Sequence, residues 1–374
     1  MSNENPTPEF LTAYDQGIGI VNRNMIRDYN VIPSPFPRMA GYYPGVEWGT
    51  YNAITASSGV GKSQFTDFHF VHEPVDFYNK NPDKVRVKIF YHSLEMPPAV
   101  KALQFLAHKI YRDTGERIGI KKMMKISGEL SKAEYALVNS YKDYFRWFFQ
   151  VVELSGAGVS PFAIFKQIDN FYKANGEIIR KKTFDHKWDP KLHQDVATER
   201  EIIDHYEAND NDLMVILVLD HVGLINTSKG QTLWEAIGKL SSYMVQLRNL
   251  FGLTVAWVQQ QSADQESKDN FKRPTLSGLG DNKIVQRDAD NIFGLYDPFR
   301  HNDRTCNGWE VNKMNQRYRE LILMKSRYGP ANMKTDLIYD GTTEMFRELP
   351  NASTCGDDMI RQWVDYASGL PVIM

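Results

Sequence analysis

Apolar positions along the chain occur either in short continuous runs or at helical spacing, which predicts strands separated by helices. The clearest strands are residues 51 to 55, residues 85 to 93 and the runs LMVILVLD and LTVAWVQ, where β-branched and aromatic residues dominate. Between them, apolar residues three and four apart predict helices in AVKALQFLAHKIY, PFAIFKQIDNFYKA and LWEAIGKLSSYMVQLRNLF. This order predicts an α/β fold, with a mostly parallel sheet and helices on both faces.

Two further segments extend this pattern. SKAEYALVNSYKDYFRWFF predicts one long helix that opens with a capping box of Ser131 and Glu134, and the overlapping FFQVVEL predicts a strand. Later in the chain, ELILMKS, TDLIYD and EMFREL predict short strands with a turn at Asp340-Gly341. We therefore expect the sheet to end in an antiparallel C-terminal edge.

The pattern divides the chain into one core and several attachments. Residues 1–45 are rich in Pro, Gly, Asn and aromatic residues, which indicates an N-terminal extension or linker with one short helix around residues 8 to 28. Residues 46–349 carry the alternating elements, interrupted by polar inserts at about 177–211 and 298–316. Residues 350–374 are expected to form a C-terminal tail. No internal repeat is visible.

Composition and charge narrow the class of protein. The 374 residues are 42% hydrophobic and 24% charged, as in ordinary globular proteins, and the net charge of −2 provides no overall attraction to nucleic acid. No apolar run approaches the roughly 20 residues that cross a bilayer, and the N-terminus lacks the features of a signal peptide, so we expect a cytoplasmic protein without membrane contact. Cys306 and Cys355 have neither zinc-ligand spacing nor a disulfide framework around them.

The strongest chemical signal is the segment ASSGVGKS at residues 56–63, a Walker A motif with Ala56 in place of the usual first glycine. It follows a predicted strand and precedes QFTDFHF, which predicts a helix. Without a strand before it and a helix after it, GKS could simply be part of a Gly- and Ser-rich turn that binds no nucleotide. In this setting, backbone N–H groups and the helix N-terminus face the phosphates, Lys62 bridges the β and γ oxygens, and Ser63 holds Mg²⁺. The expected ATP-binding residues are Ser57, Ser58, Gly59, Val60, Gly61, Lys62, Ser63 and Gln64.

Two carboxylates follow predicted strands. The run MVILVLD ends in Asp220, at the strand end where open α/β sheets bind their ligands, so Asp220 is expected to hold Mg²⁺ as a Walker B aspartate. The segment HSLEM places Glu95 at the same edge, where a carboxylate can polarise the water that attacks the γ-phosphate. Alternatively, Glu95 only begins the following helix, because acidic residues are favoured near helix N-termini.

The order of these and later motifs resembles the motor domain of DnaB-type replicative helicases. The motifs are ASSGVGKS, FYHSLEMPP, VILVLDHVGLI, TVAWVQQQS, RPTLSGLGDNKIVQRDADNIFGLY and LILMKSRYGP, and the resemblance covers about residues 35 to 349. Alanine at the start of Walker A is usual in that family. The resemblance implies a RecA-like P-loop NTPase core in residues 46–349, as the motor domain of a hexameric ring that moves on single-stranded DNA.

The resemblance also implies roles for individual residues. Glu95 matches the catalytic glutamate, and Gln259 matches the glutamine that senses the γ-phosphate and couples it to the DNA-binding loops. Lys325 and Arg327 match the lysine and arginine finger that reach the ATP of the neighbouring subunit. Residues 226 to 231 and 261 to 287 match the loops that line the central channel.

The chain also departs from the family. The amino-terminal helical domain, which contacts primase, has no counterpart here, and neither does the insert at 177 to 211. A compact version of this kind would suit a bacteriophage, acting in the host cytoplasm. His221 stands where a tyrosine is usual, and we interpret it as a packing residue beside the magnesium site.

The evidence for DNA binding is weaker than that for ATP. Acidic residues are interleaved with the cations of the expected channel loop, as in an ordinary solvated loop, although a ring needs only one or two phosphate contacts per subunit. The cluster from Arg180 to Lys182, followed by Trp188, is interpreted as solvated surface. The residues expected to contact DNA are Lys268, Lys272, Arg273, Lys283 and Arg287.

The sequence therefore predicts an ATP-hydrolysing, replicative-type DNA helicase that works as a homo-oligomeric ring, with a primase or loader as a possible partner. Two alternatives remain open at this point. A RecA-like recombinase or recombination mediator would use the same phosphate chemistry in a filament. An ATP-gated assembly protein would hydrolyse ATP without opening a duplex.

Overall fold

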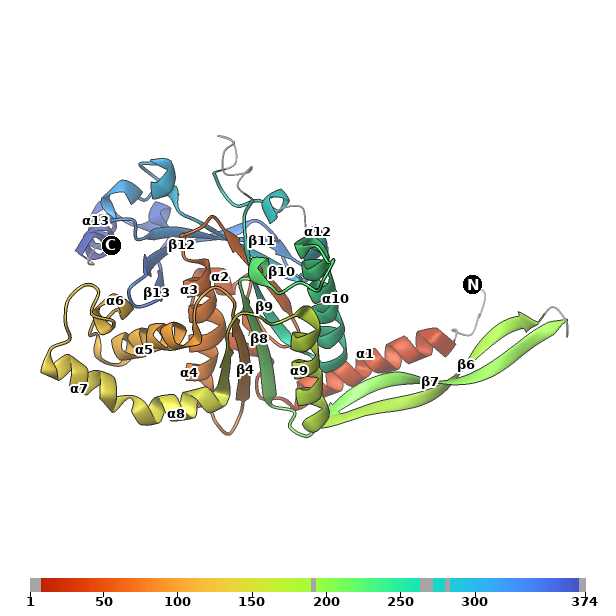
Figure 1. The fold of residues 1–374 in the computed structure, drawn as a ribbon. Helices are drawn as coiled ribbons and strands as arrows, with labels where there is room; N and C mark the ends of the chain where they lie inside the picture. The colour runs from red at the N-terminus through yellow and green to blue at the C-terminus, as the bar shows by residue number, and fades with distance from the viewer. Residues whose placement is uncertain (1–7, 190–192, 263–271, 280–282, 370–374) are drawn as a thin grey trace.

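A twisted β-sheet runs through the centre of the molecule (Figure 1). The computed structural model describes residues 8–189, 193–262, 272–279 and 283–369. Among these residues, nine strands form one sheet in the order β13-β12-β11-β10-β3-β9-β8-β4-β5. The strands from β10 to β5 are parallel, whereas β11, β12 and β13 pair antiparallel. The predicted fold class, with its antiparallel C-terminal edge, is confirmed.

The strands of this sheet have the following bounds. They are β3 (Tyr51–Ala56), β4 (Arg86–Ser93), β5 (Val152–Ser155), β8 (Leu213–Asp220), β9 (Thr254–Gln260), β10 (Asn291–Tyr296), β11 (Tyr318–Ser326), β12 (Met333–Asp340) and β13 (Met345–Glu348). A separate small pair joins β1 (Val31–Pro33) to β2 (Gly45–Glu47). Strand β10 was not among the strands read from the pattern, although it lies between β3 and the antiparallel edge.

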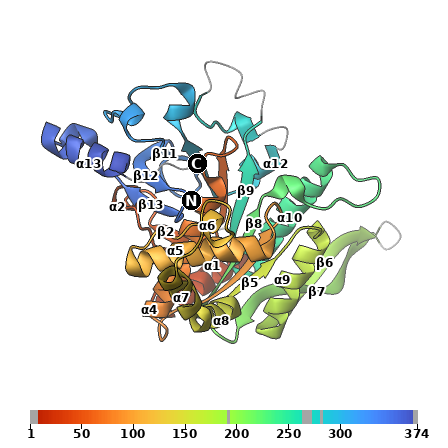
Figure 2. The ribbon, with the colours of Figure 1, turned by 60° about the vertical axis from the view of Figure 1, so that its left-hand side comes forward.

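Helices cover both faces of the sheet, as predicted (Figures 1 and 2). On one face lie α3 (Lys62–Asp67), α4 (Glu73–Lys80), α5 (Pro98–Thr114) and α8 (Lys142–Val151). On the other face lie α9 (Pro161–Ala174), α10 (Leu233–Phe251) and α12 (Lys283–Asp288). The remaining helices are α1 (Pro8–Ile26), α2 (Pro37–Ala40), α6 (Ile120–Met123), α7 (Lys132–Ser140) and α13 (Asp357–Gly369).

Strand β8 shows why its sequence is apolar without alternation. Val215, Leu217 and Leu219 pack into the core on the α10 face, whereas Met214, Ile216 and Val218 pack into the core on the α5 face. A central parallel strand is buried on both sides, so every position must be apolar. The apolar run ends at Asp220 because β8 ends there, at the carboxyl ends of the parallel strands.

The prediction of one helix over residues 131 to 149 is wrong at Tyr141. The capping box of Ser131 and Glu134 is present, but α7 ends at Ser140 and α8 starts at Lys142. The turn lets α7 cover a small apolar cluster around Ile110, while α8 covers the sheet.

The predicted strand FFQVVEL is correct only in its last residues. Helix α8 continues to Val151, and β5 starts at Val152. Phe148 stays in the helix because its ring packs against that of Phe105 on α5, with 5.5 Å between ring centroids.

The polar insert at 177 to 211 forms a long β-hairpin that projects from the body (Figure 1). Its strands are β6 (Gly176–Asp189) and β7 (Gln194–Ala208), and they pair antiparallel. Cross-strand ion pairs join Lys181 to Asp204 and Lys182 to Glu199, both at 2.6 Å. Two of the three cations in the cluster from Arg180 to Lys182 therefore have acidic partners within the hairpin.

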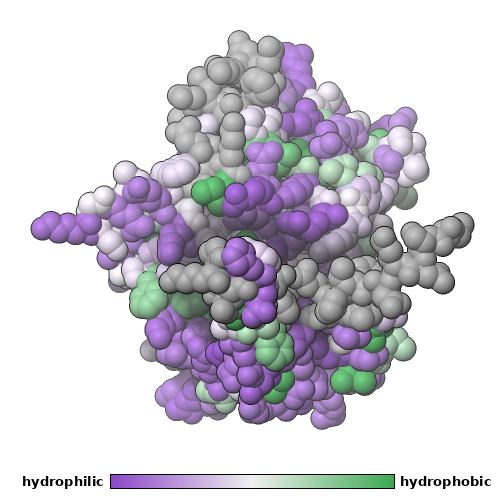
Figure 3. Space-filling view, turned by 90° about the vertical axis from the view of Figure 1, so that its right-hand side faces the viewer, coloured by the Kyte–Doolittle hydropathy of each residue, from purple (hydrophilic) through white to green (hydrophobic). Residues whose placement is uncertain are grey.

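Helix α1 lies alongside this hairpin and is the helix expected within the N-terminal extension (Figure 1). Gln16 donates a hydrogen bond to the carbonyl of Asp204, and Arg27 donates one to the carbonyl of Asn211 at 2.7 Å. Viewed from the hairpin side, the surface is mostly hydrophilic, with apolar residues only in small separate patches (Figure 3). Within the ranges that the structure describes, no helix is both long and apolar enough to span a membrane.

Candidate nucleotide-binding site

The segment between β3 and α3 forms a tight loop at the carboxyl end of the parallel strands. Gly61 is the N-cap of α3 with φ of 110° and ψ of 25°, a left-handed conformation that favours glycine. A Cβ atom on Gly61 would also lie 3.1 Å from the ring of Tyr339. The loop therefore needs glycine here for its backbone conformation and for its close packing on β12.

Two arginines hold the outer side of this loop, and neither was singled out in the sequence. The buried Arg319 on β11 donates a hydrogen bond from Nε to the carbonyl of Val60 at 2.7 Å. Arg300, from the insert at 298 to 316, donates one to the carbonyl of Ser58. Loop carbonyls are thus turned outward onto arginines, an arrangement that leaves amide groups for the inner side. An arginine far away in sequence gives no local signal of such a contact.

Lys62 and Ser63 occupy the first turn of α3. The Nζ atom of Lys62 donates a hydrogen bond to the carbonyl of Ser57 at 3.0 Å, so its ammonium folds back over the loop. The hydroxyl of Ser63 donates one to Oδ1 of Asp220 at 2.8 Å. Gln64, the last residue of the predicted ATP-binding segment, is half-buried in the same turn. The two predicted metal-binding residues are therefore adjacent in space.

Glu95 lies in the turn after β4, close to the end of β8. Ser93 of β4 is in register with Asp220, and Glu95 follows two residues later. Its carboxylate is 63% exposed and lies 3.9 Å from Nε2 of His221, whose Nδ1 accepts a hydrogen bond from the amide of Gly223. The side chain of His221 is 19% exposed and faces Glu95, a contact that was not predicted from the sequence.

This arrangement fits a nucleotide with a divalent metal. A hydroxyl and a carboxylate oxygen are the ligands that Mg²⁺ prefers, and Mg²⁺ usually takes its remaining ligands from phosphates and water. The described residues contain no group of three or more His, Cys, Asp and Glu side chains that could hold a metal ion. The start of α3 adds a helix N-terminus, which favours anionic phosphate.

Gln259 lies at the end of β9, next to the loop. It is in register with Thr55 of β3. Its side-chain oxygen accepts a hydrogen bond from Trp257 at 3.1 Å, and its amide donates one to the carbonyl of Leu279 at 2.6 Å. Gln259 therefore links the end of β9, next to the P-loop, to the segment around Leu279.

Lys325 and Arg327 lie near the amino ends of the parallel strands, whereas the P-loop lies at their carboxyl ends. Ser326 is in register with Asn291 of β10, which in turn pairs with Asn52 near the start of β3. Four residues separate Asn52 from Ala56, which amounts to about 13 Å along the strand. Neither side chain is positioned to reach the P-loop of its own chain.

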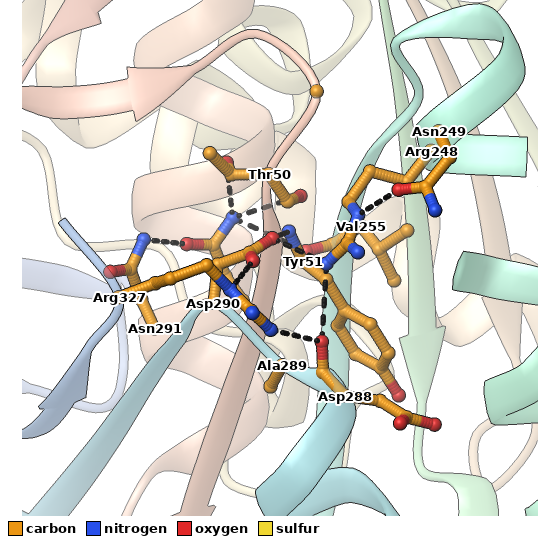
Figure 4. Close-up of polar contacts among 12 residues, drawn as sticks. Thr50, Tyr51, Arg248, Asn249, Val255, Asp288, Ala289, Asp290, Asn291 and Arg327 are labelled. Carbon is orange, nitrogen blue, oxygen red and sulfur yellow. Dashed lines mark hydrogen bonds and ion pairs between the residues drawn. The ribbon is translucent and has the colours of Figure 1, made fainter. Parts of the chain in front are cut away.

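Both side chains are instead held by the segment around Asp290, and Figure 4 shows the contacts of Arg327. Arg327 contacts Oδ1 of Asp290 at 2.5 Å, and Arg248 contacts Oδ2 at 2.7 Å. Lys325 donates hydrogen bonds to three carbonyls at the end of α12, including that of Ala289 at 2.7 Å. These contacts fix the direction of both cations relative to the sheet.

The predicted DNA-contacting cations differ in their surroundings. Lys272 is 43% exposed and pairs with Asp303 at 2.9 Å, and Arg287 is 76% exposed and pairs with Asp288 at 2.8 Å. Arg273 pairs at 2.5 Å with Glu320, whose side chain is fully buried. Lys268 and the side chain of Lys283 lie outside the described residues. Arg273 therefore has a structural role in addition to any contact with DNA.

Comparisons with known proteins agree with this geometry. Residues 189–348 match the family of the DnaB-like helicase C terminal domain. These residues make up less than half of the chain, so the chain is similar to that family over part of its length. The predicted resemblance is confirmed, and with it the expected enzyme class, an ATP hydrolase of the helicase type.

Two solved structures have a fold similar to that of this chain. One is an isolated ATPase domain with 16% identity and a TM-score of 0.61, in a match that covers 93% of this chain and 100% of that chain. Another is a DnaB-like replicative helicase described with its interactions with primase, with 17% identity and a TM-score of 0.60, covering 89% of this chain and 67% of that one. No curated protein matches at the level of sequence.

Proposed function

We propose that this DnaB-like chain is the ATP-driven motor of a ring helicase that moves along single-stranded DNA, with residues 46–349 as its motor domain. One observation carries the proposal. The Walker A loop, Asp220 and Glu95 come together at the carboxyl ends of the parallel strands. Lys325 and Arg327 lie near the amino ends of the same strands. A closed ring of such subunits brings these two sets of residues together from neighbouring chains.

The residues at the carboxyl ends of the parallel strands have different roles in ATP binding and hydrolysis. The loop amides and Lys62 bind the phosphates, while Ser63 and Asp220 hold Mg²⁺, which neutralises charge on the phosphates when it is bound. Glu95 orients and deprotonates the attacking water, since it is exposed at this end of the strands and is not engaged in holding the loop. His221 limits the positions that the Glu95 carboxylate adopts.

Lys325 and Arg327 complete the ATP site of the neighbouring subunit. Their distance from the P-loop of their own chain and their attachment to Asp290 and α12 favour action across an interface. Hydrolysis then depends on assembly, as expected for a homo-oligomer, for which we propose a hexameric ring.

Gln259 couples ATP turnover to the DNA. It contacts Leu279, and the cations expected to touch single-stranded DNA lie in the segment between β9 and α12 and in α12 itself. A primase or a loader is proposed as a partner by analogy with the DnaB-like helicase described with primase.

A forked-duplex assay tests this function. We expect ATP-dependent strand separation that requires a single-stranded tail and that is lost in Lys62→Ala. ATP-dependent coating of DNA without separation would indicate the recombinase class instead. ATP-dependent assembly with neither DNA coating nor separation would indicate an assembly protein.

A further inference from the structure

A buried lysine lies directly behind the proposed magnesium site. Lys101 is on α5 and is 1% exposed. Its Nζ atom lies 2.7 Å from Oδ2 of Asp67 and 3.6 Å from Oδ2 of Asp220. Asp67 is fully buried and is the last residue of α3, the helix that begins at Lys62. The ion pair therefore ties α5 to the back of the P-loop helix and to the end of β8.

Such a pair has a physical cost, because charges buried away from water lose hydration. Apolar residues of similar size would fill the same space between α3 and α5 without that cost. The ammonium of Lys101 instead has two carboxylates close to it, Asp67 at 2.7 Å and Asp220 at 3.6 Å.

The two oxygens of Asp220 have different partners. Oδ1 accepts the hydrogen bond from Ser63 at 2.8 Å, on the side of the P-loop. Oδ2 points into the protein, where the hydroxyl of Tyr91 donates a hydrogen bond at 3.0 Å and Lys101 supplies the charge. Oδ1 of Asp220 thus faces the P-loop, and Oδ2 faces the interior of the protein.

We propose that Lys101, anchored by Asp67, is a positioning residue for the magnesium site: it holds Oδ2 of Asp220 so that only Oδ1 faces Ser63 and the metal. The inference rests on the function proposed above. Because a carboxylate held through one oxygen rotates less, it binds Mg²⁺ as a single fixed ligand. Groups behind a metal ligand commonly change metal affinity by about 10-fold to 100-fold when they are removed.

Further buried side chains lie near the ion pair of Lys101 and Asp67. Glu344 is 1% exposed, and its carboxyl contacts His72, whose ring stacks on that of His108 at 3.7 Å between centroids. His108 contacts the carbonyl of Thr343 at 3.0 Å through Nδ1. Glu344 is close enough to Lys101 and Asp67 to interact electrostatically with both.

The experiment removes the ion pair as a unit, since removal of one partner would leave a buried charge alone. The variant combines Lys101→Met with Asp67→Leu; if it fails to fold, Lys101→Gln with Asp67→Asn keeps a neutral polar pair in the same place. The matched control combines Lys109→Met with Asp113→Leu, an ion pair of 2.8 Å on the same helix that does not face Asp220. Two quantities are measured on the full chain: Mn²⁺ affinity in the presence of ADP, by electron paramagnetic resonance, and affinity for a fluorescent ADP analogue in EDTA.

We expect Mn²⁺ affinity to fall about tenfold or more in the variant, while metal-free ADP affinity changes by less than about twofold and the control variant behaves as wild type. Equal or tighter Mn²⁺ binding in a folded variant would overturn the inference and leave the proposed function intact. Equal losses of metal-free ADP binding and Mn²⁺ binding would also overturn it, because they indicate a general collapse of the P-loop. If wild type with ADP binds no Mn²⁺, the proposed function fails and the inference fails with it.

Discussion

Ser63 at the start of α3 donates a hydrogen bond to Asp220 at the end of β8 across 2.8 Å, although 157 residues separate them in the sequence. The contact forms because β3 and β8 are parallel strands of one sheet whose carboxyl ends lie at the same edge. It joins the phosphate-binding loop to the carboxylate expected to share the metal.

Replacement of Lys62 by alanine is expected to abolish ATP turnover. Its ammonium is the charge placed over the loop, 3.0 Å from the carbonyl of Ser57, and the phosphates lose that charge in the variant. Release of inorganic phosphate and binding of a fluorescent ATP analogue measure the effect, with thermal unfolding as a control for folding. Normal turnover in Lys62→Ala would rule out the assignment of this loop.

Glu95→Gln is expected to keep ATP bound while slowing hydrolysis by a factor on the order of 10² or more. The side chain is 63% exposed, so the melting temperature should stay unchanged. Single-turnover hydrolysis and equilibrium ATP binding, measured on the same preparation, separate the two effects. A loss of ATP affinity with normal turnover would make Glu95 a binding or structural residue.

Two inactive variants, Lys62→Ala and Arg327→Ala, are expected to restore activity when their subunits exchange. An interface is complete when its P-loop comes from the Arg327→Ala chain and its arginine from the Lys62→Ala chain. Random mixing in equal amounts makes about one quarter of the interfaces complete, if each acts independently. Steady-state hydrolysis against the mixing ratio measures the recovery.

The fold should tolerate Arg327→Ala in this experiment. Asp290 keeps its contact with Arg248 at 2.7 Å and the hydrogen bond from the amide of Tyr51 at 2.8 Å. Each variant mixed with itself is the control. No recovery despite demonstrated co-assembly would contradict an arginine supplied by the neighbour.

Lys272→Ala is expected to weaken binding of single-stranded DNA and to reduce the salt slope of log K by about 0.7, the value for one lost phosphate contact. Lys313→Ala serves as the control, because Lys313 is an exposed lysine with an acidic partner, Glu310, at 2.8 Å. Fluorescence anisotropy at several salt concentrations gives the slope. An unchanged slope would indicate that Lys272 only pairs with Asp303.

Arg273→Ala is unsuitable for the same test. It removes one of the partners of a buried carboxylate, Glu320, and is expected to lower the melting temperature. Any loss of DNA binding in that variant would then reflect the fold as well as the contact.

Glu344→Gln is expected to change how stability depends on pH. Burial raises the pKa of Glu344 from 4.5 to about 7, so the folded state holds a proton that the unfolded state releases. Stability contributed by this group is therefore present at low pH and falls as the pH rises from about 4.5 to about 7. Above pH 7 the variant should be more stable than wild type by at most about 3 kcal/mol.

Buried histidines act in the opposite direction and must be separated from this effect. Burial lowers the pKa of His72 and His108, so their contribution to stability is lost as the pH falls through about 6.5. The difference in unfolding free energy between variant and wild type at each pH reports Glu344 together with its contact to His72. Glu129→Gln, at an exposed position, is the control, and a difference that is flat across pH 5 to 8 would contradict the prediction.

Local sequence was sufficient for the nucleotide loop and for most of the elements. Gly61, Lys62 and Ser63 follow one another in the chain, and a left-handed N-cap followed by a helix is a property of those few residues. The run from Leu213 to Asp220 is apolar throughout because burial on both faces acts on every position of the strand. Such patterns are visible in a single sequence.

The sequence by itself determined the class of fold, the P-loop and the strand ends that carry Asp220 and Glu95, because each depends on neighbouring residues. Tertiary structure alone decided the bend at Tyr141, the hairpin from Gly176 to Ala208, and the pairing of Lys101 with Asp67 behind Asp220. A lysine in an amphipathic helix has the same local pattern whether it faces water or a buried carboxylate. Only the packing of α5 against α3 and β8 removes the water from around Lys101 and leaves the carboxylates as its partners.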